Sequence, residues 1–412
     1  MKRVGIIGGG ASGLVAAIAA ARNGAQVTVL EHTGKFGKKL LATGNGRCNL
    51  TNNALDAKHY PGNPDFALQV IEGFDHEATC EFFEKIGIIT WCNPEGYVYP
   101  RSLQASSVVN ALICAADHLG VKLLGGVTTT GISAKNTSDK ERIFSVQTDK
   151  GLYEFDRLIL ACGSKASPNT GSDGSGYHLA KSLGLNLTPI VPALVPLTSS
   201  WKGFKDLSGV RVKGKVDLLF EGKLIASDEG ELQLTDYGIS GIPVFQVSRY
   251  AAYACLEKGI NLEVRLDFFP EYSFNELLSL FHRQTISCGH IRCGDFLSGL
   301  LPEKLGRALL KLSKIDYEMA AEDLDNRKLR LLSQNAKSFC VPITGTLGFD
   351  RAQICAGGVQ VSELSSKTME CKRIPGLYIV GELVDVDGVC GGYNLQFAWS
   401  SGSLAGKAAA LK

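Results

Sequence analysis

The sequence predicts an α/β protein with a doubly wound parallel sheet, and three observations near its start lead to this fold class. An apolar strand over residues 3–8 enters a glycine-rich turn, and an alanine-rich helix follows over about residues 12–23. A second strand over residues 26–31 ends in an acidic residue, Glu31. This order is the βαβ opening of such a sheet, with a right-handed crossover.

The glycine turn carries the residues that a dinucleotide-binding site needs. Gly8 allows a tight turn out of the strand, Gly10 lets the backbone approach a pyrophosphate, and Gly13 lets the helix pack closely on the sheet. Free N–H groups at the helix start favour the anion. Glu31 follows at the expected distance of about 20 residues to bind a ribose diol. The segment therefore predicts binding of an adenine dinucleotide.

The rest of the first domain alternates between helical and strand patterns. Between residues 34 and 51, a segment rich in glycine and cations predicts a loop beside the ligand. The predicted helices cover about residues 77–86, 105–119 and 176–184, and the predicted strands cover residues 121–135, 143–149 and 157–162. A strand over residues 376–380 and a helix from about residue 395 predict that this domain resumes near the end of the chain.

The middle of the chain differs from the first part in the order of its predicted strands and helices, and this difference predicts an inserted domain. We expect the first domain to comprise residues 1–190 and 341–412, and the insert to comprise residues 191–340. Within the insert, strands dominate over about residues 191–270 and helices over about residues 271–340. The predicted elements are hairpin strands over residues 210–220 and 223–227 and helices over residues 242–258, 274–285, 302–313 and 323–334.

Composition excludes several classes of protein. The chain has 412 residues, 45% of them hydrophobic and 20% charged, and a formal net charge of +2. This balance argues against a strongly basic nucleic-acid binder and a membrane-surface protein. No apolar run reaches the roughly 20 residues of a membrane span. Because a strand and glycines stand where a signal peptide would carry its cleavage site, we expect a cytoplasmic protein.

The 12 cysteines form no CxxC pair, which is typical of reduced thiols. Cys288, His290 and Cys293 resemble metal ligands, but no fourth donor stands at a telling distance. We therefore expect no metal site.

A second informative stretch follows the strand over residues 376–380. Acidic groups after Gly381 are candidates to bind ribose or ribitol hydroxyls, and spacing does not choose among Glu382, Asp385 and Asp387. Gly391 and Gly392 then open a helix whose first N–H groups, near residues 394–396, suit a reduced flavin that is anionic near N1. The alternative is a terminal helix with a flexible glycine start.

Together these segments resemble the bacterial YhiN/BaiN family of FAD-dependent oxidoreductases. The resemblance rests on the glycine turn with Glu31, on KKLLATGNGRCNLTN at residues 38–52, and on GELVDVDGVCGGYNLQFAWSSG at residues 381–402. It extends along nearly the whole chain. It implies a glutathione-reductase-like, Rossmann-like FAD-binding domain with an inserted β-barrel and helical domain, and a flavin ring that faces the insert.

The resemblance also implies cofactor contacts at matching positions. The pyrophosphate would meet the glycine turn, Glu31 the adenosine ribose, and the backbone of Val127 the adenine. The implied contacts are Gly8, Gly10, Ala11, Ser12, Gly13, Glu31, Lys39, Gly46, Arg47, Cys48, Val127, Ala161, Gly163, Gly381, Glu382, Asn394, Leu395 and Gln396.

Three features of these segments have a second interpretation. Lys38, Lys39 and Arg47 are either solvated or bonded to phosphate. Cys48 is either a reactive thiol near the flavin or a buried inert cysteine. Tyr393 either stacks on or protonates near the ring, or simply packs. The chain also departs from the family in the insert, where it has Asp236 in TDYGISGI instead of the histidine of Thr-His-x-Gly-x-Ser-Gly-Pro.

The function that follows is hydride transfer from reduced FAD to a polarised double bond. The chain shows no second glycine fingerprint, so NAD(P)H would dock transiently as the electron donor. The family is associated with conjugated C=C bonds of bile-acid steroid rings and with uracil in ribosomal RNA. The insert has 19 Lys and Arg against 19 Asp and Glu over residues 191–340, which favours a small molecule over RNA. The rivals are a non-catalytic flavin-bound redox-responsive factor and an oxidase or dehydrogenase running in the opposite direction. The oligomeric state is left open.

Overall fold

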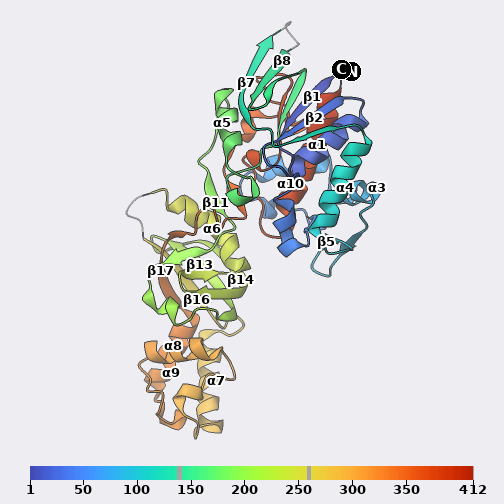
Figure 1. Ribbon diagram of the computed structural model, residues 1–412. Helices are drawn as coiled ribbons and strands as arrows, with labels where there is room; N and C mark the ends of the chain where they lie inside the picture. Colours follow the sequence, from blue (N-terminus) through green and yellow to red (C-terminus); the bar gives the residue numbers. More distant parts are fainter. Residues whose placement is uncertain (137–141, 258–260, 412) are drawn as a thin grey trace. The chain divides into compact units, whose positions relative to one another are not determined.

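The computed structural model describes residues 1–136, 142–257 and 261–411 and forms two compact units (Figure 1). Unit 1 contains Met1–Val191 and Gln353–Lys412, and unit 2 contains Pro192–Ala352. Unit 1 is thus built from both ends of the chain, with unit 2 as a continuous insertion.

A five-stranded parallel sheet forms the centre of unit 1. Its strands lie in the order β19-β10-β1-β2-β6, and every neighbouring pair is parallel. The strands are β1 (Arg3–Ile7), β2 (Gln26–Glu31), β6 (Lys122–Gly125), β10 (Arg157–Leu160) and β19 (Leu377–Ile379). Because a parallel sheet is covered on both faces, these strands are nearly continuous apolar runs, as RVGII and RLIL illustrate.

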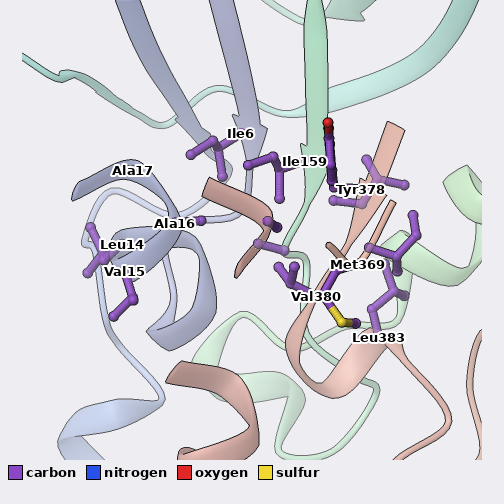
Figure 2. Packing of buried hydrophobic residues seen from close by; sticks show 14 of the residues in the cluster. Ile6, Leu14, Val15, Ala16, Ala17, Ile159, Met369, Tyr378, Val380 and Leu383 are labelled. Carbon is purple, nitrogen blue, oxygen red and sulfur yellow. The ribbon is translucent and has the colours of Figure 1, made fainter. Parts of the chain in front are cut away.

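Helices pack on this sheet, and α1 (Ala11–Arg22) and α10 (Tyr393–Ala410) lie tightly against each other. Two glycines of α10 make this approach possible. A Cβ atom on Gly402 would lie 2.4 Å from the carbonyl oxygen of Ser12, and one on Gly406 would lie 2.3 Å from that of Ala16. Figure 2 shows the adjoining core, with Ile6 and Ile159 from neighbouring strands near α1.

A three-stranded antiparallel sheet also packs against the central sheet. Phe155 of this small sheet lies over Gly5 of β1, where a Cβ atom would lie 2.3 Å from the phenyl ring. Its strands are β7 (Thr129–Asn136), β8 (Arg142–Thr148) and β9 (Gly151–Phe155). The single strand predicted over residues 121–135 is therefore wrong, because the chain leaves the central sheet after β6 and enters this separate sheet at β7.

Unit 1 contains six helices of eight or more residues among the described residues and a further small sheet. The helices besides α1 and α10 are α2 (Pro64–Glu72), α3 (His76–Lys85), α4 (Ala105–His118) and α5 (Ser175–Ser182). One small sheet contains β3 (Thr51–Asn52), β5 (Tyr97–Pro100) and β4 (Thr90–Cys92). The chain also has two short strands near the limits of the units, β11 (Val191–Ala193) and β18 (Ile354–Ala356). Helix α2, which begins at a proline in its first turn, was not predicted.

Unit 2 is a closed six-stranded barrel with a group of helices. The barrel order is β12-β15-β14-β13-β16-β17. Its strands are β12 (Leu197–Ser199), β13 (Arg211–Phe220), β14 (Lys223–Thr235), β15 (Gly238–Ser240), β16 (Leu262–Asp267) and β17 (Phe339–Thr346). The last strand follows the helices in sequence and closes the barrel, so the predicted return to the first domain at residue 341 falls inside β17.

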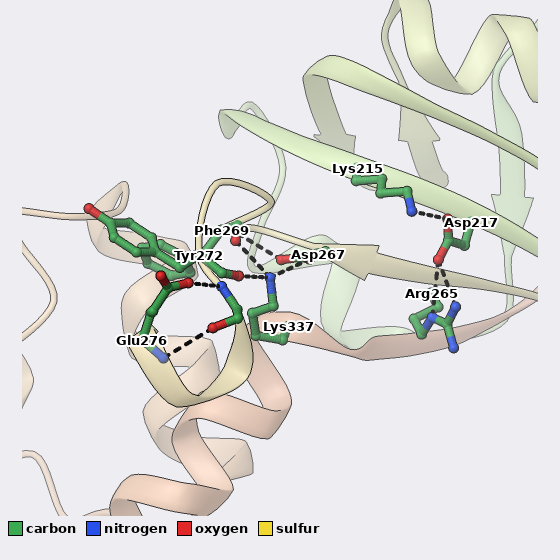
Figure 3. Close-up of polar contacts among 9 residues, drawn as sticks. Lys215, Asp217, Arg265, Asp267, Phe269, Tyr272, Glu276 and Lys337 are labelled. Atoms are coloured by element: carbon green, nitrogen blue, oxygen red, sulfur yellow. Dashed lines mark hydrogen bonds and ion pairs between the residues drawn. The ribbon is translucent and has the colours of Figure 1, made fainter. Parts of the chain in front are cut away.

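The helices of unit 2 are α6 (Ile242–Ala254), α7 (Phe274–Ser287), α8 (Glu303–Leu312) and α9 (Asn326–Lys337). Lys337 at the end of α9 connects the helices to the barrel (Figure 3). Its ammonium group lies 2.7 Å from the carboxylate of Asp267 on β16 and donates to the carbonyls of Phe269 and Tyr272. Lys337 and Asp267 are both more than four-fifths buried, so this contact is screened little by solvent.

Candidate functional site

The glycine turn joins β1 to α1 with the geometry that a pyrophosphate needs. Gly8 has φ +107°, and a Cβ atom there would lie 2.3 Å from the carbonyl oxygen of Ala161. A Cβ atom on Gly13 would lie 2.0 Å from the carbonyl oxygen of Gly8. By contrast, a Cβ atom on Gly10 would meet no atom within 4 Å. Gly8 and Gly13 are therefore required by the fold itself, whereas Gly10 faces open space at the start of α1, next to Ala11 and Ser12.

Glu31 lies at the end of β2 beside this turn and is buried. Its carboxylate accepts the N–H of Gly9 at 2.7 Å and both the N–H and the hydroxyl of Thr33 at 2.7 and 2.8 Å. The Nδ1 of His32 lies 3.2 Å away. Burial opposes the charge, but the hydrogen bonds from His32, Gly9 and Thr33 outweigh it and hold the pKa of Glu31 below its ordinary value. A preorganised carboxylate thus stands at the predicted ribose position.

Two further predicted contacts surround the turn. Ala161 follows β10, and its N–H donates to the carbonyl of Ile7 at 2.8 Å, so it forms the wall behind Gly8. Gly163, with φ +72°, lies two residues further on. Val127 lies beyond the end of β6, and its N–H donates to the carbonyl of Glu31 at 2.9 Å. Because the N–H of Val127 is already bonded, the predicted backbone contact of Val127 with adenine can involve only its carbonyl group.

Lys39 and Glu382 come from opposite ends of the chain and form an ion pair. The Nζ of Lys39 lies 2.6 Å from the Oε2 of Glu382, and the hydroxyl of Ser164 donates to the same oxygen at 3.0 Å. Glu382 follows Gly381, where a Cβ atom would lie 2.5 Å from the Oγ of Ser12. The structure therefore brings these predicted residues together at the start of α1.

The loop that follows Lys39 bends through several residues of positive φ. These include Gly46 at +83° and Cys48 at +58°, with the exposed Arg47 between them. Cys48 is fully buried, and burial raises the pKa of its thiol to about 12. A thiol that stays protonated is a poor nucleophile. The structure therefore favours the inert interpretation of Cys48.

The start of α10 combines a glycine pair with unpaired N–H groups. Gly391 and Gly392 have φ +134° and +94°, and no side chain caps the helix among the described residues. The side chain of Asn394 is paired with the backbone of Gly388 in both directions at 2.8 Å. Asn394 and Leu395 can therefore offer a ligand only their backbone N–H groups.

Gln396, a predicted flavin contact, has its hydrogen-bonding groups engaged within the protein. Its side chain is fully buried, accepts the hydroxyl of Thr51 at 2.5 Å, and donates to the carbonyl of Phe74 at 2.9 Å. Its N–H donates to the carbonyl of Gly392 at 2.9 Å. Gln396 therefore holds the helix in the core.

Tyr393 is 5% exposed and packs between aromatic neighbours. Its ring stacks on His59 with centroids 4.2 Å apart and an angle of 14°, and Tyr60 meets it edge-on at 6.0 Å. Burial raises the pKa of the Tyr393 hydroxyl to about 12. The packing interpretation therefore accounts for Tyr393 better than the role of proton donor.

Two buried polar atoms that the sequence did not single out lie near the predicted ends of the cofactor. The Oδ1 of Asn49 has no hydrogen-bond partner in the described structure, and it lies against Gly392, where a Cβ atom would be 3.0 Å from it. The Oγ1 of Thr129, two residues beyond Val127, is equally unpaired. A buried polar atom without a partner is costly, so the Asn49 oxygen beside the glycine pair is suited to a ligand; the Oε1 of Gln284 in unit 2 is also unpaired in the described structure. The open space at Gly10 and the unpaired oxygen of Asn49 are the two observations that fit a bound dinucleotide.

Other predicted features lie in unit 2. Asp236 is exposed in the turn between β14 and β15. Cys288 is exposed, whereas Cys293 is buried and its thiol lies 3.7 Å from the carbonyl of Ala320. In the part of the chain that the structure describes, no group of three His, Cys, Asp or Glu side chains is arranged to hold a metal. No helix of the described residues is both long and apolar enough to cross a bilayer.

The parallel sheet, the glycine turn and the buried Glu31 are the features of a dinucleotide-binding protein with a Rossmann-like fold. The chain belongs to the family described as HI0933-like protein Rossmann domain, whose model matches residues 2–408. This family membership confirms the resemblance drawn from the sequence, and the protein is a flavin-dependent oxidoreductase.

Two relatives cover nearly the whole chain. A protein of Clostridium scindens named 3-dehydro-bile acid delta(4,6)-reductase is 47% identical over 100% of this chain and 99% of its own length. A ribosomal RNA dihydrouridine synthase of Haemophilus influenzae is 30% identical over 96% of this chain and 95% of its own length.

A solved structure supports the fold. The 3-ketosteroid delta1-dehydrogenase of Sterolibacterium denitrificans, crystallised with 1,4-androstadiene-3,17-dione, covers 100% of both chains with a TM-score of 0.52 and 11% identity. At this identity the similarity concerns the fold alone.

Proposed function

We propose that the protein uses FAD, reduced by NAD(P)H, to saturate a conjugated C=C bond in a small steroid-like enone of the bile-acid type. The observation that carries this proposal is the 47% identity, over 100% of this chain and 99% of the relative, to the 3-dehydro-bile acid delta(4,6)-reductase of Clostridium scindens. The balanced charge of residues 191–340 supports a small molecule, because RNA affinity normally depends on a basic surface.

The residues of unit 1 suit this cofactor. The N–H groups at the start of α1 would hold the pyrophosphate above Gly10, and Glu31 would accept the adenosine ribose hydroxyls. Glu382, held by Lys39 and Ser164, would accept a ribitol hydroxyl. The free N–H groups at the start of α10 would face the electron-rich edge of the flavin. When bound, FAD supplies the hydride for the double bond.

Anaerobic rapid mixing tests this proposal in two half-reactions. Mixing with NADH and with NADPH measures reduction of the flavin, and mixing the reduced protein with a 3-oxo-delta(4,6) steroid measures its reoxidation. The saturated 3-oxo steroid is the matched control, because it lacks only the conjugated bonds. We expect rapid reoxidation by the enone alone. Flavin that neither nicotinamide reduces would contradict the proposal and favour the non-catalytic factor.

A second candidate is reduction of uracil to dihydrouridine in ribosomal RNA. It is supported by the 30% identity to the dihydrouridine synthase of Haemophilus influenzae, which covers 96% of this chain. A ribosomal RNA transcript that lacks dihydrouridine serves as the alternative acceptor in the same experiment. Reoxidation by this transcript, weakened steeply by salt, would favour the RNA substrate.

A further inference from the structure

We propose that His59 donates a hydrogen bond from its Nε2 to the carbonyl oxygen of the conjugated substrate and so activates the double bond for hydride addition. This inference rests on the proposed function, and it names the group that recognises the carbonyl. His59 lies in unit 1, at the end of a short 3-10 turn (Ala57–His59).

The ring of His59 is held in one orientation by two contacts. Its Nδ1 accepts the N–H of Asp56 at 3.2 Å, and its face stacks on Tyr393 at 4.2 Å. Because Nδ1 acts as the acceptor, the proton of the neutral ring belongs on Nε2. The two contacts therefore leave an N–H donor on the side of the ring away from Asp56.

The surroundings of His59 keep this ring neutral. Burial lowers the pKa of His59, the nearby Lys58 lowers it further, and Asp56 opposes them. Protonation of Nδ1 would also break the hydrogen bond from Asp56. The ionisable groups around the ring are Asp56 and Lys58 on its own turn, the adjacent Tyr60, and Tyr393 on α10. A neutral imidazole with a defined tautomer is suited to polarising a carbonyl.

The position of His59 brings this donor to the flavin end of the proposed site. Tyr393, on which the ring stacks, is the first residue of α10. The N–H of Val389, in the loop before the glycine pair, donates to the carbonyl of His59 at 3.0 Å. The unpaired Oδ1 of Asn49 lies at the same glycine pair. Unlike the buried Tyr393, His59 is partly exposed and can reach a substrate.

The chemistry balances as follows. A hydride, which the nicotinamide ultimately supplies through the cofactor, adds to the β-carbon, and the π electrons move to the carbonyl oxygen. The Nε2–H of His59 stabilises the negative charge that develops there. A proton from water then adds to the α-carbon and the carbonyl re-forms. His59 keeps its own proton throughout, so the step needs no change in its charge.

Two substitutions separate the donor from the ring. His59→Phe keeps an aromatic ring against Tyr393 but has no N–H donor, and His59→Gln keeps an N–H donor without the ring. His118→Gln, at an exposed position at the end of α4, is the matched control. The anaerobic half-reactions are measured for each variant, together with the ultraviolet band of the steroid enone bound to the oxidised protein, which moves to longer wavelength when its carbonyl is polarised.

We expect H59F to slow reoxidation by the enone about 100-fold, the cost of removing one such donor, and to lose the shift of the enone band. The reoxidation rate of H59Q should fall between those of H59F and the wild type. If H59F fails to fold, H59Q still tests the proposal. Reduction by the nicotinamide should stay within about twofold in both variants, because the donor acts on the other half-reaction.

Wild-type reoxidation rates and an unchanged band shift in both variants would overturn the role of His59 alone. A wild-type protein that no enone reoxidises would overturn the proposed function and the role of His59 with it. A loss confined to a Tyr393→Phe variant would transfer the donor to the phenol and would also overturn this inference.

Discussion

Gly10→Ala should weaken binding of the cofactor without unfolding the protein. An added methyl group has open space at Gly10, whereas it would clash with the backbone at Gly13. A Cβ atom on Gly10 meets no atom within 4 Å, and its φ of −86° and ψ of −160° suit alanine. The fold should therefore lose less than about 1 kcal/mol, the cost of alanine at a helix N-cap. A Cβ atom on Gly13 lies 2.0 Å from a backbone oxygen, so Gly13→Ala should disturb the fold itself.

The effect of Gly10→Ala on FAD follows from the space that the methyl group would take. It would occupy the position of the pyrophosphate and displace it from at least one charge-assisted hydrogen bond, each worth about 1.5–3 kcal/mol. This loss corresponds to a Kd about 10- to 100-fold higher. Titration of the apoprotein with FAD, followed by quenching of flavin fluorescence, measures the Kd, and thermal unfolding of the same apoprotein measures the fold. If Gly10→Ala bound FAD as tightly as the wild type, the pyrophosphate could not lie at this turn.

Three further substitutions or treatments test other parts of the structure. Glu31 has a lowered pKa in the folded state, so its contribution to stability is present above its unfolded pKa of about 4.5 and is lost as the pH falls through the folded value. The variant Glu31→Gln lacks this titrating group. Between about pH 6 and pH 3, its apoprotein should therefore lose less stability than the wild-type apoprotein, as measured by thermal unfolding. Lys337→Met should destabilise unit 2 by about 3 kcal/mol, because it leaves the buried carboxylate of Asp267 without its ion-pair partner. Lys213→Met is the control and should change little, because the Lys213–Glu229 pair is 3.6 Å apart and exposed. Hydrogen exchange of the β16 amides compares the two variants, and equal protection of these amides in both would contradict this reasoning. Iodoacetamide should alkylate the exposed Cys114 of the native protein and leave the buried Cys48 unmodified until the chain unfolds, as measured by peptide mass mapping. Labelling of Cys48 in the native protein would instead support its interpretation as a reactive thiol.

Local patterns predicted the dinucleotide-binding part of the fold well. The strand, the glycine turn and the helix at residues 3–23 follow from short-range rules, and the structure reproduces them within a residue or two. The family match and the structural similarity confirm the predicted α/β class with an inserted barrel. The long apolar stretch over residues 121–135 was misjudged because two strands of different sheets follow each other with only a short turn at Gly126.

Local sequence patterns could not predict which strands and side chains far apart in the sequence pair with each other. Strand β17 alternates buried and exposed residues like any strand, and only its pairing with β12 and β16 assigns it to the barrel. The same limit applies to the site. Gln396 stands in a distinctive motif, yet its partners Thr51 and Phe74 lie more than 300 residues away in sequence. Asn49 gave no signal beyond its place in the GRCN segment, because an unpaired oxygen becomes visible only when its neighbours are known.

The close contact of α1 with α10 places a condition on synthesis of the protein. The turn at Gly10 is translated well before the helix that supports it, because Gly402 and Gly406, which pack against α1, lie far along the chain. A nascent chain therefore carries this face of α1 without its partner until α10 has been translated.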